Sequence, residues 1–182
     1  MSPAELLPRD VSGRFEHTVL PHLHSAYNLA RWITRNPHDA EDVVQEAYVR
    51  ALRWFDTFKP GSDARAWLLK IVRNTAYTWL RSNRPEELVL QDAETTRELA
   101  DSSRGPEDAL LEKVNSELLR QALNELSVEH REALILRELE GLSYREISQV
   151  AKVPVGTVMS RLARARRELF TRLHGVTPEV KG

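Results

Sequence analysis

The chain has 182 residues, a formal net charge of −1 and no cysteine. This length suits one or two small domains, and the lack of cysteine excludes a disulfide framework and a thiolate metal site. Hydrophobic residues make up 41% of the chain, which is enough for packed cores. No apolar run reaches the length of a membrane span, and the N-terminus carries no signal-peptide pattern. We therefore expect a soluble, cytoplasmic protein without membrane insertion.

The small net charge hides an uneven distribution along the chain. Residues 83–117 carry 4 basic and 10 acidic side chains, whereas the blocks on either side are mildly basic. This segment contains Pro85, Gly105 and Pro106 and has no sustained apolar period, which is typical of a linker. We expect an all-α protein in which two small helical domains are joined by a flexible acidic linker. The expected boundaries are a tail over 1–14, a domain over 15–84, a linker over 85–112, a domain over 113–173 and a tail over 174–182.

The first domain opens with an apolar pattern of helical period. Its members are Phe15, Val19, Leu23, Tyr27 and Ala30. Pro21 lies inside this pattern and must break or kink the helix. The segment Asn36-Pro37-His38-Asp39 predicts a turn, with Asp39 as the cap of the next helix.

A second helix is predicted from about residue 40 to residue 55. Its inner face comprises Val44, Ala47, Ala51 and Phe55. Its outer face comprises Glu41, Asp42, Gln45, Val49 and Arg53. The simplest interpretation of the outer face is a solvated surface with helical pairs such as Glu46 with Arg50.

A third helix is predicted from about residue 64 to residue 81, capped by Ser62 or Asp63. Leu68, Ile71, Val72 and Thr75 form its inner face. Its other face is a basic stripe that comprises Lys70, Arg73, Tyr77, Arg81 and Arg84. Cations interleaved with an aromatic ring favour binding of single-stranded nucleic acid, because phosphates meet the cations and bases stack on the ring. The alternative is that Tyr77, Trp67 and Trp79 are core residues.

The second domain contains a pattern of two short helices and a tight turn, from Gly141 to Arg167. Gly141 can end the preceding helix in a left-handed conformation, Ser143 and Glu146 form a capping box, and Pro154 fits the entry of the second helix. The predicted core comprises Leu142, Ile147, Val150, Val153, Val158 and Leu162. This arrangement predicts a helix-turn-helix that presents one helix to the major groove of DNA.

The second helix of this motif has two predicted faces. Val155, Val158, Leu162 and Ala165 point inward. Thr157, Ser160, Arg161 and Arg164 share an outward face whose hydroxyls and guanidinium groups suit phosphates and base edges. From Thr157 to Arg172 there are five arginines and one acidic residue. A solvated amphipathic helix is the alternative for this segment taken alone.

The sequence does not indicate an enzyme. The six histidines are scattered, and there is no glycine-rich phosphate loop and no zinc-protease motif. The carboxylates cluster on a solvated helix and in the linker rather than in a cleft. We expect no catalytic residues, no metal site, no cofactor and no small-molecule substrate.

Three segments carry a family resemblance: Asp39 to Ala51, Ala66 to Thr75 and Gly141 to Arg166. In this order they resemble the extracytoplasmic-function group of bacterial sigma factors, over roughly residues 15–82 and 115–173. The resemblance implies that the domains correspond to sigma regions two and four. It further implies a subunit that binds core RNA polymerase, directs it to a promoter and helps open the DNA. An anti-sigma factor and a response to environmental or envelope stress are the expected regulation.

The resemblance also assigns roles to residues. The set expected on the clamp helices of the largest polymerase subunit is Glu41, Asp42, Gln45, Glu46 and Val49, and region four is expected on the flap of the second subunit. The set expected on the minus-ten element, where one base is flipped out, is Phe58, Lys59, Lys70, Arg73, Asn74, Tyr77 and Arg81. The set expected on the minus-thirty-five element is Thr157, Ser160, Arg161 and Arg164. Met159 departs from the Lys or Arg that relatives often carry, and Ser127 replaces a common proline but is itself a good cap.

Two other classes of protein are considered. An ordinary helix-turn-helix regulator would carry a sensor or dimerisation domain and would bind duplex DNA without polymerase. A decoy that mimics a sigma factor would need a switch domain and would tend to lose the arginines that face DNA. The basic stripe of residues 64–84 and the clamp-type helix of residues 40–55 argue against the ordinary regulator. The intact arginines, and the lack of room for a switch domain, argue against the decoy.

Overall fold

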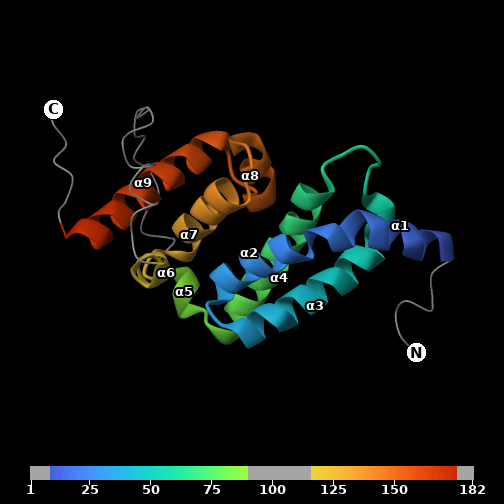
Figure 1. Cartoon of the computed structure of the whole chain (residues 1–182), viewed down its shortest axis with the longest axis horizontal. Helices are drawn as coiled ribbons and strands as arrows, with labels where there is room; N and C mark the ends of the chain where they lie inside the picture. The colour runs from blue at the N-terminus through green and yellow to red at the C-terminus, as the bar shows by residue number, and fades with distance from the viewer. Residues whose placement is uncertain (1–8, 90–115, 176–182) are drawn as a thin grey trace. The chain divides into compact units, whose positions relative to one another are not determined.

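The computed structural model describes residues 9–89 and 116–175, and within these ranges it contains helices and no strands (Figure 1). The predicted all-α fold is confirmed. The described chain divides into two compact units, with the boundary between Asn83 and Arg84. Most of the expected linker and most of both expected tails lie outside the described residues.

The first unit begins with α1 (Arg9–Val19), a 3₁₀ turn η2 (Leu20–His22) and α2 (Leu23–Thr34). The predicted break at Pro21 is confirmed, because this proline lies in the 3₁₀ turn. The turn also interrupts the apolar pattern of helical period. Phe15, Val19 and Ala30 of this pattern are buried, but Leu23 is 49% exposed.

α3 (Pro37–Arg53) begins three residues before the predicted start. The prediction that Asp39 is its cap is wrong. The Asn36 side chain accepts hydrogen bonds from the backbone N–H groups of His38 (2.9 Å) and Asp39 (3.2 Å), and Pro37 occupies the first turn, where its missing N–H is tolerated. Asp39 instead lies within the first turn, where a carboxylate interacts favourably with the helix dipole.

α4 (Ala64–Asn83) follows the 3₁₀ turn η3 (Phe55–Thr57) and a loop. The Asp63 carboxylate accepts a hydrogen bond from the N–H of Ala66 at 3.1 Å, and the hydroxyl of Ser62 donates to the Lys59 carbonyl instead. Of the two predicted caps, Asp63 is therefore the one used. α2, α3 and α4 pack against one another, and α1 also contacts α4 (Figure 1). The predicted inner faces of α3 and α4 are buried in this bundle.

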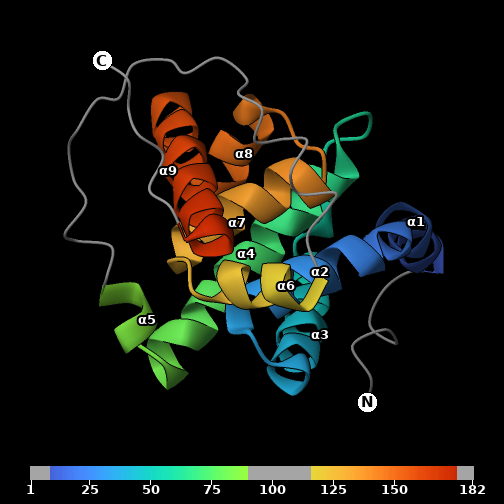
Figure 2. The ribbon, with the colours of Figure 1, turned by 60° about the vertical axis from the view of Figure 1, so that its left-hand side comes forward.

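Over residues 84–89 and 116–175, the second unit contains five helical segments. They are α5 (Glu86–Val89), α6 (Ser116–Asn124), α7 (Val128–Leu134) with its π-helical continuation η7 (Ile135–Leu139), α8 (Tyr144–Ala151) and α9 (Val155–His174). α7 and α6 both pack against α9 (Figure 2). Leu136, Leu142, Ile147 and Leu162 lie in the core of this unit. Of the predicted core of the helix-turn-helix, Val153 alone is only half-buried.

The predicted local signals of the helix-turn-helix are confirmed. Gly141 adopts a φ of 65° after η7, and Ser143 and Glu146 form the capping box, with distances of 3.2 Å and 2.6 Å. Lys152 ends α8 in the left-handed region, and Pro154 precedes the first residue of α9. Ser127 caps α7 by accepting a hydrogen bond from the N–H of His130.

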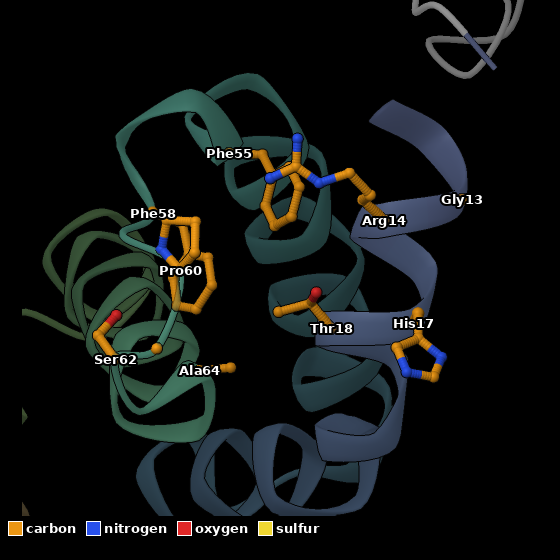
Figure 3. A pocket seen from close by; sticks show the side chains of 10 residues that line it. Gly13, Arg14, His17, Thr18, Phe55, Phe58, Pro60, Ser62 and Ala64 are labelled. Carbon is orange, nitrogen blue, oxygen red and sulfur yellow. The ribbon is translucent and has the colours of Figure 1, made fainter. Parts of the chain in front are cut away.

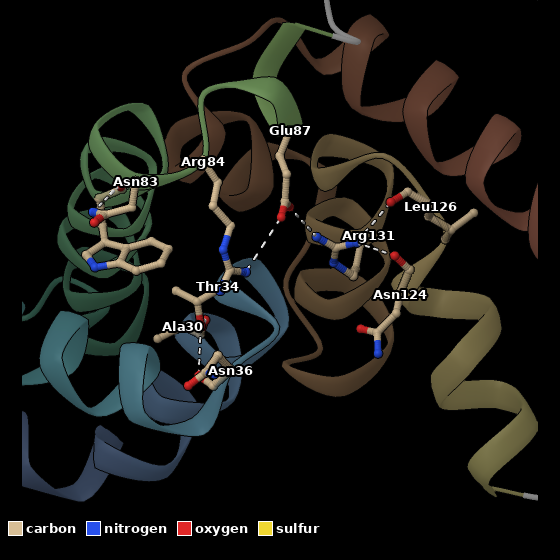
Figure 4. A network of polar contacts seen from close by, with 10 residues as sticks. Ala30, Thr34, Asn36, Asn83, Arg84, Glu87, Asn124, Leu126 and Arg131 are labelled. Carbon is tan, nitrogen blue, oxygen red and sulfur yellow. Dashed lines mark hydrogen bonds and ion pairs between the residues drawn. The ribbon is translucent and has the colours of Figure 1, made fainter.

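A buried arginine organises the other end of the second unit (Figure 4). Arg131, which is 1% exposed, donates hydrogen bonds to the carbonyl oxygens of Asn124 (3.2 Å) and Leu126 (2.9 Å) and so braces the turn between α6 and α7. Its guanidinium also lies 4.0 Å from the Glu87 carboxylate of α5. Arg84, which was expected to extend the basic stripe of α4, follows the end of that helix and pairs with Glu87 at 3.6 Å.

Candidate nucleic-acid interface

The inward face of α9 is formed by Val158, Leu162, Ala165 and Leu169, which are all buried. The prediction that Val155 belongs to this face is wrong, because Val155 is 40% exposed. It is the first residue of the helix, and it lies beyond the layer of buried side chains that begins at Val158.

Arg161 lies on the flank of α9 that faces α7 rather than on the open face. Its guanidinium donates a hydrogen bond of 2.8 Å to the Glu129 carboxylate of α7. The two side chains are only 16% and 18% exposed, so this ion pair is partly shielded from water. Sequence reasoning missed the pair because the partners are 32 residues apart.

Two further arginines of α9 are also held by acids of the same unit. Arg166 donates to Glu138 at 2.7 Å, and Arg172 donates to Glu125. Three of the five arginines between residues 157 and 172 therefore balance carboxylates on α7, on η7 and in the turn that follows α6. The apparent excess of positive charge on this helix is largely internal to the unit.

The open face of α9 is formed by other residues. Gly156, Met159 and Arg167 are exposed, and Ser160 and Arg164 are half-buried next to them. The Ser160 hydroxyl donates to the Thr157 carbonyl at 3.0 Å, and Thr157 is half-buried. The helical period places residues 156, 160, 163, 164 and 167 opposite the buried face. Sequence reasoning missed Arg167, which the period alone could have placed, and treated Met159 only as a departure from the family.

The flank of α9 that faces α7 also carries a histidine–carboxylate contact, two turns after Arg161. Nδ1 of the buried His130 lies 2.9 Å from a Glu168 carboxylate oxygen. The hydrogen bond from His130 lowers the pKa of Glu168 below its ordinary value, and the charges of Arg172 and Arg164 act in the same direction against the effect of burial. Glu168, the only acid between residues 157 and 172, therefore joins α9 to α7.

In the first unit, the predicted minus-ten residues differ in exposure. Lys59, Lys70 and Arg81 are exposed, and Phe58, Arg73 and Asn74 are half-buried. Tyr77, which was expected on the basic stripe, is 4% exposed, and the guanidinium carbon of Arg73 lies 3.8 Å from its ring centroid. α4 packs against α1, α2 and α3, so its buried face is wider than a single apolar stripe. Trp67 and Trp79 are half-buried.

An open groove of about 700 Å³ lies beside the loop that follows η3 (Figure 3). It is lined by this loop, η3, the start of α4 and residues 13–18 of α1. Phe58 lines it and stacks on Phe55, with ring centroids 5.8 Å apart and planes at 8°. Trp67 packs edge-on against Phe58 at 5.4 Å, which fixes the ring further. Arg14 and His17 of α1 face the same groove, and the sequence analysis did not select them.

Asn74 does not line this groove. It lies ten residues after Ala64 on α4, which corresponds to about 15 Å along the helix axis. The groove beside Phe58 and the position of Asn74 are therefore separate features of one surface. The predicted minus-ten residues therefore lie on the same unit but do not line a single groove.

The outer face of α3 borders a second groove. Glu41, Asp42 and Gln45 line it together with Val44, Tyr48, Leu23 and Tyr27. The three polar residues are exposed, as is Glu46, while Val49 is half-buried. Glu46 pairs with Arg50 at 2.5 Å, which is the helical pair considered from the sequence. The apolar wall that α2 contributes was not predicted.

Tyr48 connects α3 to the C-terminal end of α1. Its hydroxyl donates to the Val19 carbonyl at 3.2 Å, and burial raises the pKa of Tyr48 to about 12. This tyrosine therefore stays protonated at physiological pH and serves to hold α3 on the end of α1.

A helical bundle with exposed cations on α4, followed by a helix-turn-helix unit, defines a two-part DNA-binding protein. The Sigma-70 region 2 family matches residues 18–86, and the Sigma-70, region 4 family matches residues 116–169. The RNA polymerase sigma-H factor of Pseudomonas aeruginosa is 35% identical over 187 residues, which cover 97% of this chain and 94% of that protein. The ECF RNA polymerase sigma-E factor of Escherichia coli is 36% identical over 163 residues, which cover 86% of this chain and 81% of that protein.

Solved structures agree with these matches. The sigma factor RpoE of Bartonella quintana, in complex with the anti-sigma factor NepR, has a TM-score of 0.68 and 29% identity, covering 88% of this chain and 96% of that one. CnrH, in complex with the cytosolic domain of CnrY, has a TM-score of 0.63 and 25% identity, covering 95% and 93%. The chain belongs to the extracytoplasmic-function group of the sigma-70 family, so it is an RNA polymerase sigma factor and not an enzyme. In the described ranges, no helix is long and apolar enough to span a bilayer.

Proposed function

We propose that the first unit binds core RNA polymerase and the minus-ten element, and that the second unit binds the minus-thirty-five element and the polymerase flap. The boundaries proposed for these parts are 15–84 and 113–173, with a linker over 85–112 between them. The observation that carries the proposal is the pairing of an exposed cationic helix face in one unit with a helix-turn-helix in the other, in the order of sigma regions two and four. The complex would act in the cytoplasm, where transcription takes place.

The polymerase would dock on the outer face of α3. Glu41, Asp42 and Glu46 are exposed and can meet cationic side chains of the clamp helices, while Gln45 can hydrogen-bond to them. The exposed Leu23 supplies an apolar contact at the edge of the same groove. Protein interfaces usually combine apolar contacts with charged and polar ones, as this surface does.

The separated strand would follow α4. Lys70 and Arg81 are exposed and can meet phosphates. The ring of Tyr77 would hold the Arg73 side chain through a cation–π contact rather than stack on a base. Phe58 and Lys59 on the loop, and Asn74 on the helix, would hold a flipped base, since extrusion costs a few kcal/mol that specific contacts must offset.

The duplex would meet the open face of α9. Thr157, Ser160 and Arg164 remain the proposed contacts among the residues selected from the sequence. Arg161 would act indirectly, because its ion pair with Glu129 fixes the orientation of α9 on α7. This division separates residues that touch DNA from a residue that positions the helix.

The chain would be held inactive by an anti-sigma factor until an environmental or envelope stress releases it. The support for this step is that the RpoE structure similar to this chain contains the anti-sigma factor NepR. The exposed groove between α2 and α3 is a surface that such an inhibitor could cover in competition with the polymerase.

The test of the proposed function is reconstitution of the full chain with core polymerase on a genomic DNA library, followed by mapping of transcription start sites. The expected result is a set of starts that share two upstream elements and that core enzyme alone does not produce. A matched variant, Asp42→Lys, should lose both core binding and the starts, whereas Asp42→Asn should keep most of both. A chain that never joins core enzyme would contradict the proposal.

A further inference from the structure

The first two turns of α9 carry two exposed apolar side chains, Val155 and Met159, each 40% accessible. They are four residues apart, so they lie one above the other on the same face of the helix. Burial does not explain this pair, because Val158 and Leu162 already close the core beneath the helix. Single exposed apolar residues are common on protein surfaces, but this pair lies where a recognition helix contacts base edges.

The first turn of α9 is open, and the polar side chains next to Met159, those of Ser160 and Arg161, are already engaged. A side chain added at Gly156 would meet no atom within 4 Å, so the backbone of the first turn faces open space. The Ser160 hydroxyl already donates to the Thr157 carbonyl, and the Arg161 guanidinium is turned toward Glu129. The N-terminal turns of α9 therefore present the methyl groups of Val155 and the thioether of Met159 rather than a guanidinium group.

We propose that Met159, assisted by Val155, reads the C5-methyl group of a thymine in the minus-thirty-five element; this inference rests on the proposed function of α9. Thymine is the base that presents an apolar methyl group in the major groove, whereas guanine presents two acceptors that call for Arg or Lys. A methionine has no hydrogen to donate to guanine. Its flexible, polarizable side chain can follow the position of a methyl group, and Val155 adds a second apolar surface one turn earlier.

The test uses the full chain with core polymerase and a promoter chosen by the start-site mapping. Each thymine of the minus-thirty-five element, on either strand, is replaced in turn by deoxyuridine. This change removes the methyl group and keeps every hydrogen-bonding group of the base. The proposal predicts that holoenzyme affinity falls about fourfold at one or two of these positions, which is the effect of one buried methyl group, and is unchanged at the others.

Variants assign the effect to the side chain. Met159→Ala should bind thymine and deoxyuridine promoters equally, with the affinity that the native chain shows for the deoxyuridine promoter. Met159→Leu should retain the discrimination. Leu139→Ala is the control, because Leu139 is 57% exposed in the same unit but lies outside α9; it should behave as the native chain does.

Three results would overturn the inference: native affinity that is unchanged by every deoxyuridine substitution, an element without an A·T pair, or discrimination that survives in Met159→Ala. The first two use the native chain, so misfolding of a variant cannot obscure them. Absence of any specific start site is a different outcome, because it contradicts the proposed function before base readout is tested.

Discussion

α4 and α9 look alike in sequence, since α4 carries four Lys and Arg residues and α9 carries five arginines, each within 20 residues, but the two helices differ in how these charges are paired. On α9, Arg161, Arg166 and Arg172 are paired with acids of the same unit. On α4, Lys70 and Arg81 are exposed and form no ion pair within the described residues. A count of cations along one helix therefore measures the charge available to a ligand only when neighbouring helices carry no acids at matching positions.

We propose that the difference reflects two kinds of DNA contact. An unwound strand is flexible, so scattered cations on α4 can bind its phosphates without a fixed geometry. A duplex groove demands a fixed helix orientation, and the ion pairs of α9 supply it by tying the helix to α7, η7 and α6. We infer that the arginines of α9 contribute more to positioning than to direct charge attraction.

The largest expected effect comes from reversing the charge of α4. The double variant Lys70→Glu, Arg81→Glu should lower the yield of open complex more than a hundredfold while core binding stays unchanged. The affinity of holoenzyme for a single-stranded minus-ten oligonucleotide is measured at several salt concentrations. The slope of log affinity against log salt is negative, and its magnitude should decrease by about 1.4 because two phosphate contacts are lost. The control variant Lys70→Arg, Arg81→Lys should keep the native slope. A native slope in the charge-reversed variant would show that α4 does not bind the single strand.

The next effect separates Arg164 from Arg161 on the upstream duplex. Arg164→Ala should weaken holoenzyme binding to a minus-thirty-five duplex about tenfold, within the 1–3 kcal/mol roughly expected for a direct contact. Arg161→Lys, which keeps the charge near Glu129, should stay within about twofold of the native chain. If Arg161→Lys were as weak as Arg164→Ala, Arg161 would be a DNA contact after all.

A smaller effect concerns stability. A double-mutant cycle between Arg161→Ala and Glu129→Ala, measured by urea unfolding, should give a coupling energy of about 1 kcal/mol, because the pair is partly shielded. The same cycle for Arg166 and Glu138, whose side chains are more exposed, should give less. Equal coupling in the two cycles would contradict the inference that burial distinguishes the pairs.

The smallest effect is a pH dependence carried by Glu168. Its folded pKa lies below the ordinary glutamate value because of the hydrogen bond from His130. Ionised Glu168 therefore stabilises the fold above the unfolded pKa, and this contribution is lost as the pH falls through the folded pKa. Urea unfolding between about pH 6 and pH 3 should show a shallower loss of stability in Glu168→Gln than in the native chain. Parallel curves would show that the contact contributes nothing.

The features that were predicted correctly from the sequence depend on residues that are close together in the chain. The capping box at Ser143 and Glu146, the left-handed Gly141 and the break at Pro21 each depend on a few neighbouring residues, and all are confirmed. The buried faces of α3 and α4 follow from the helical period and are also confirmed. The cap of α3 was misassigned because Asn36 and Asp39 are both good capping residues, and Pro37 decides between them by occupying the first turn.

The sequence could not show contacts between residues that are far apart in the chain. The partners of Arg161 and Arg172 lie 32 and 47 residues away, so the period of α9 gave no sign that these arginines are neutralised. Tyr77 was placed on the basic stripe because its spacing fits, but three helices pack around α4 and widen its buried face. The groove beside Phe58 likewise brings in Arg14 of α1, more than forty residues earlier.

We propose that the two units bind different forms of DNA within one polymerase complex, and footprinting of the reconstituted holoenzyme is the decisive experiment. We expect nuclease protection of intact duplex near minus thirty-five together with permanganate-reactive thymines near minus ten, both dependent on core enzyme. The double variant of α4 should lose the reactive thymines and retain the upstream protection. Loss of both signals together, or protection of duplex without core enzyme, would contradict it.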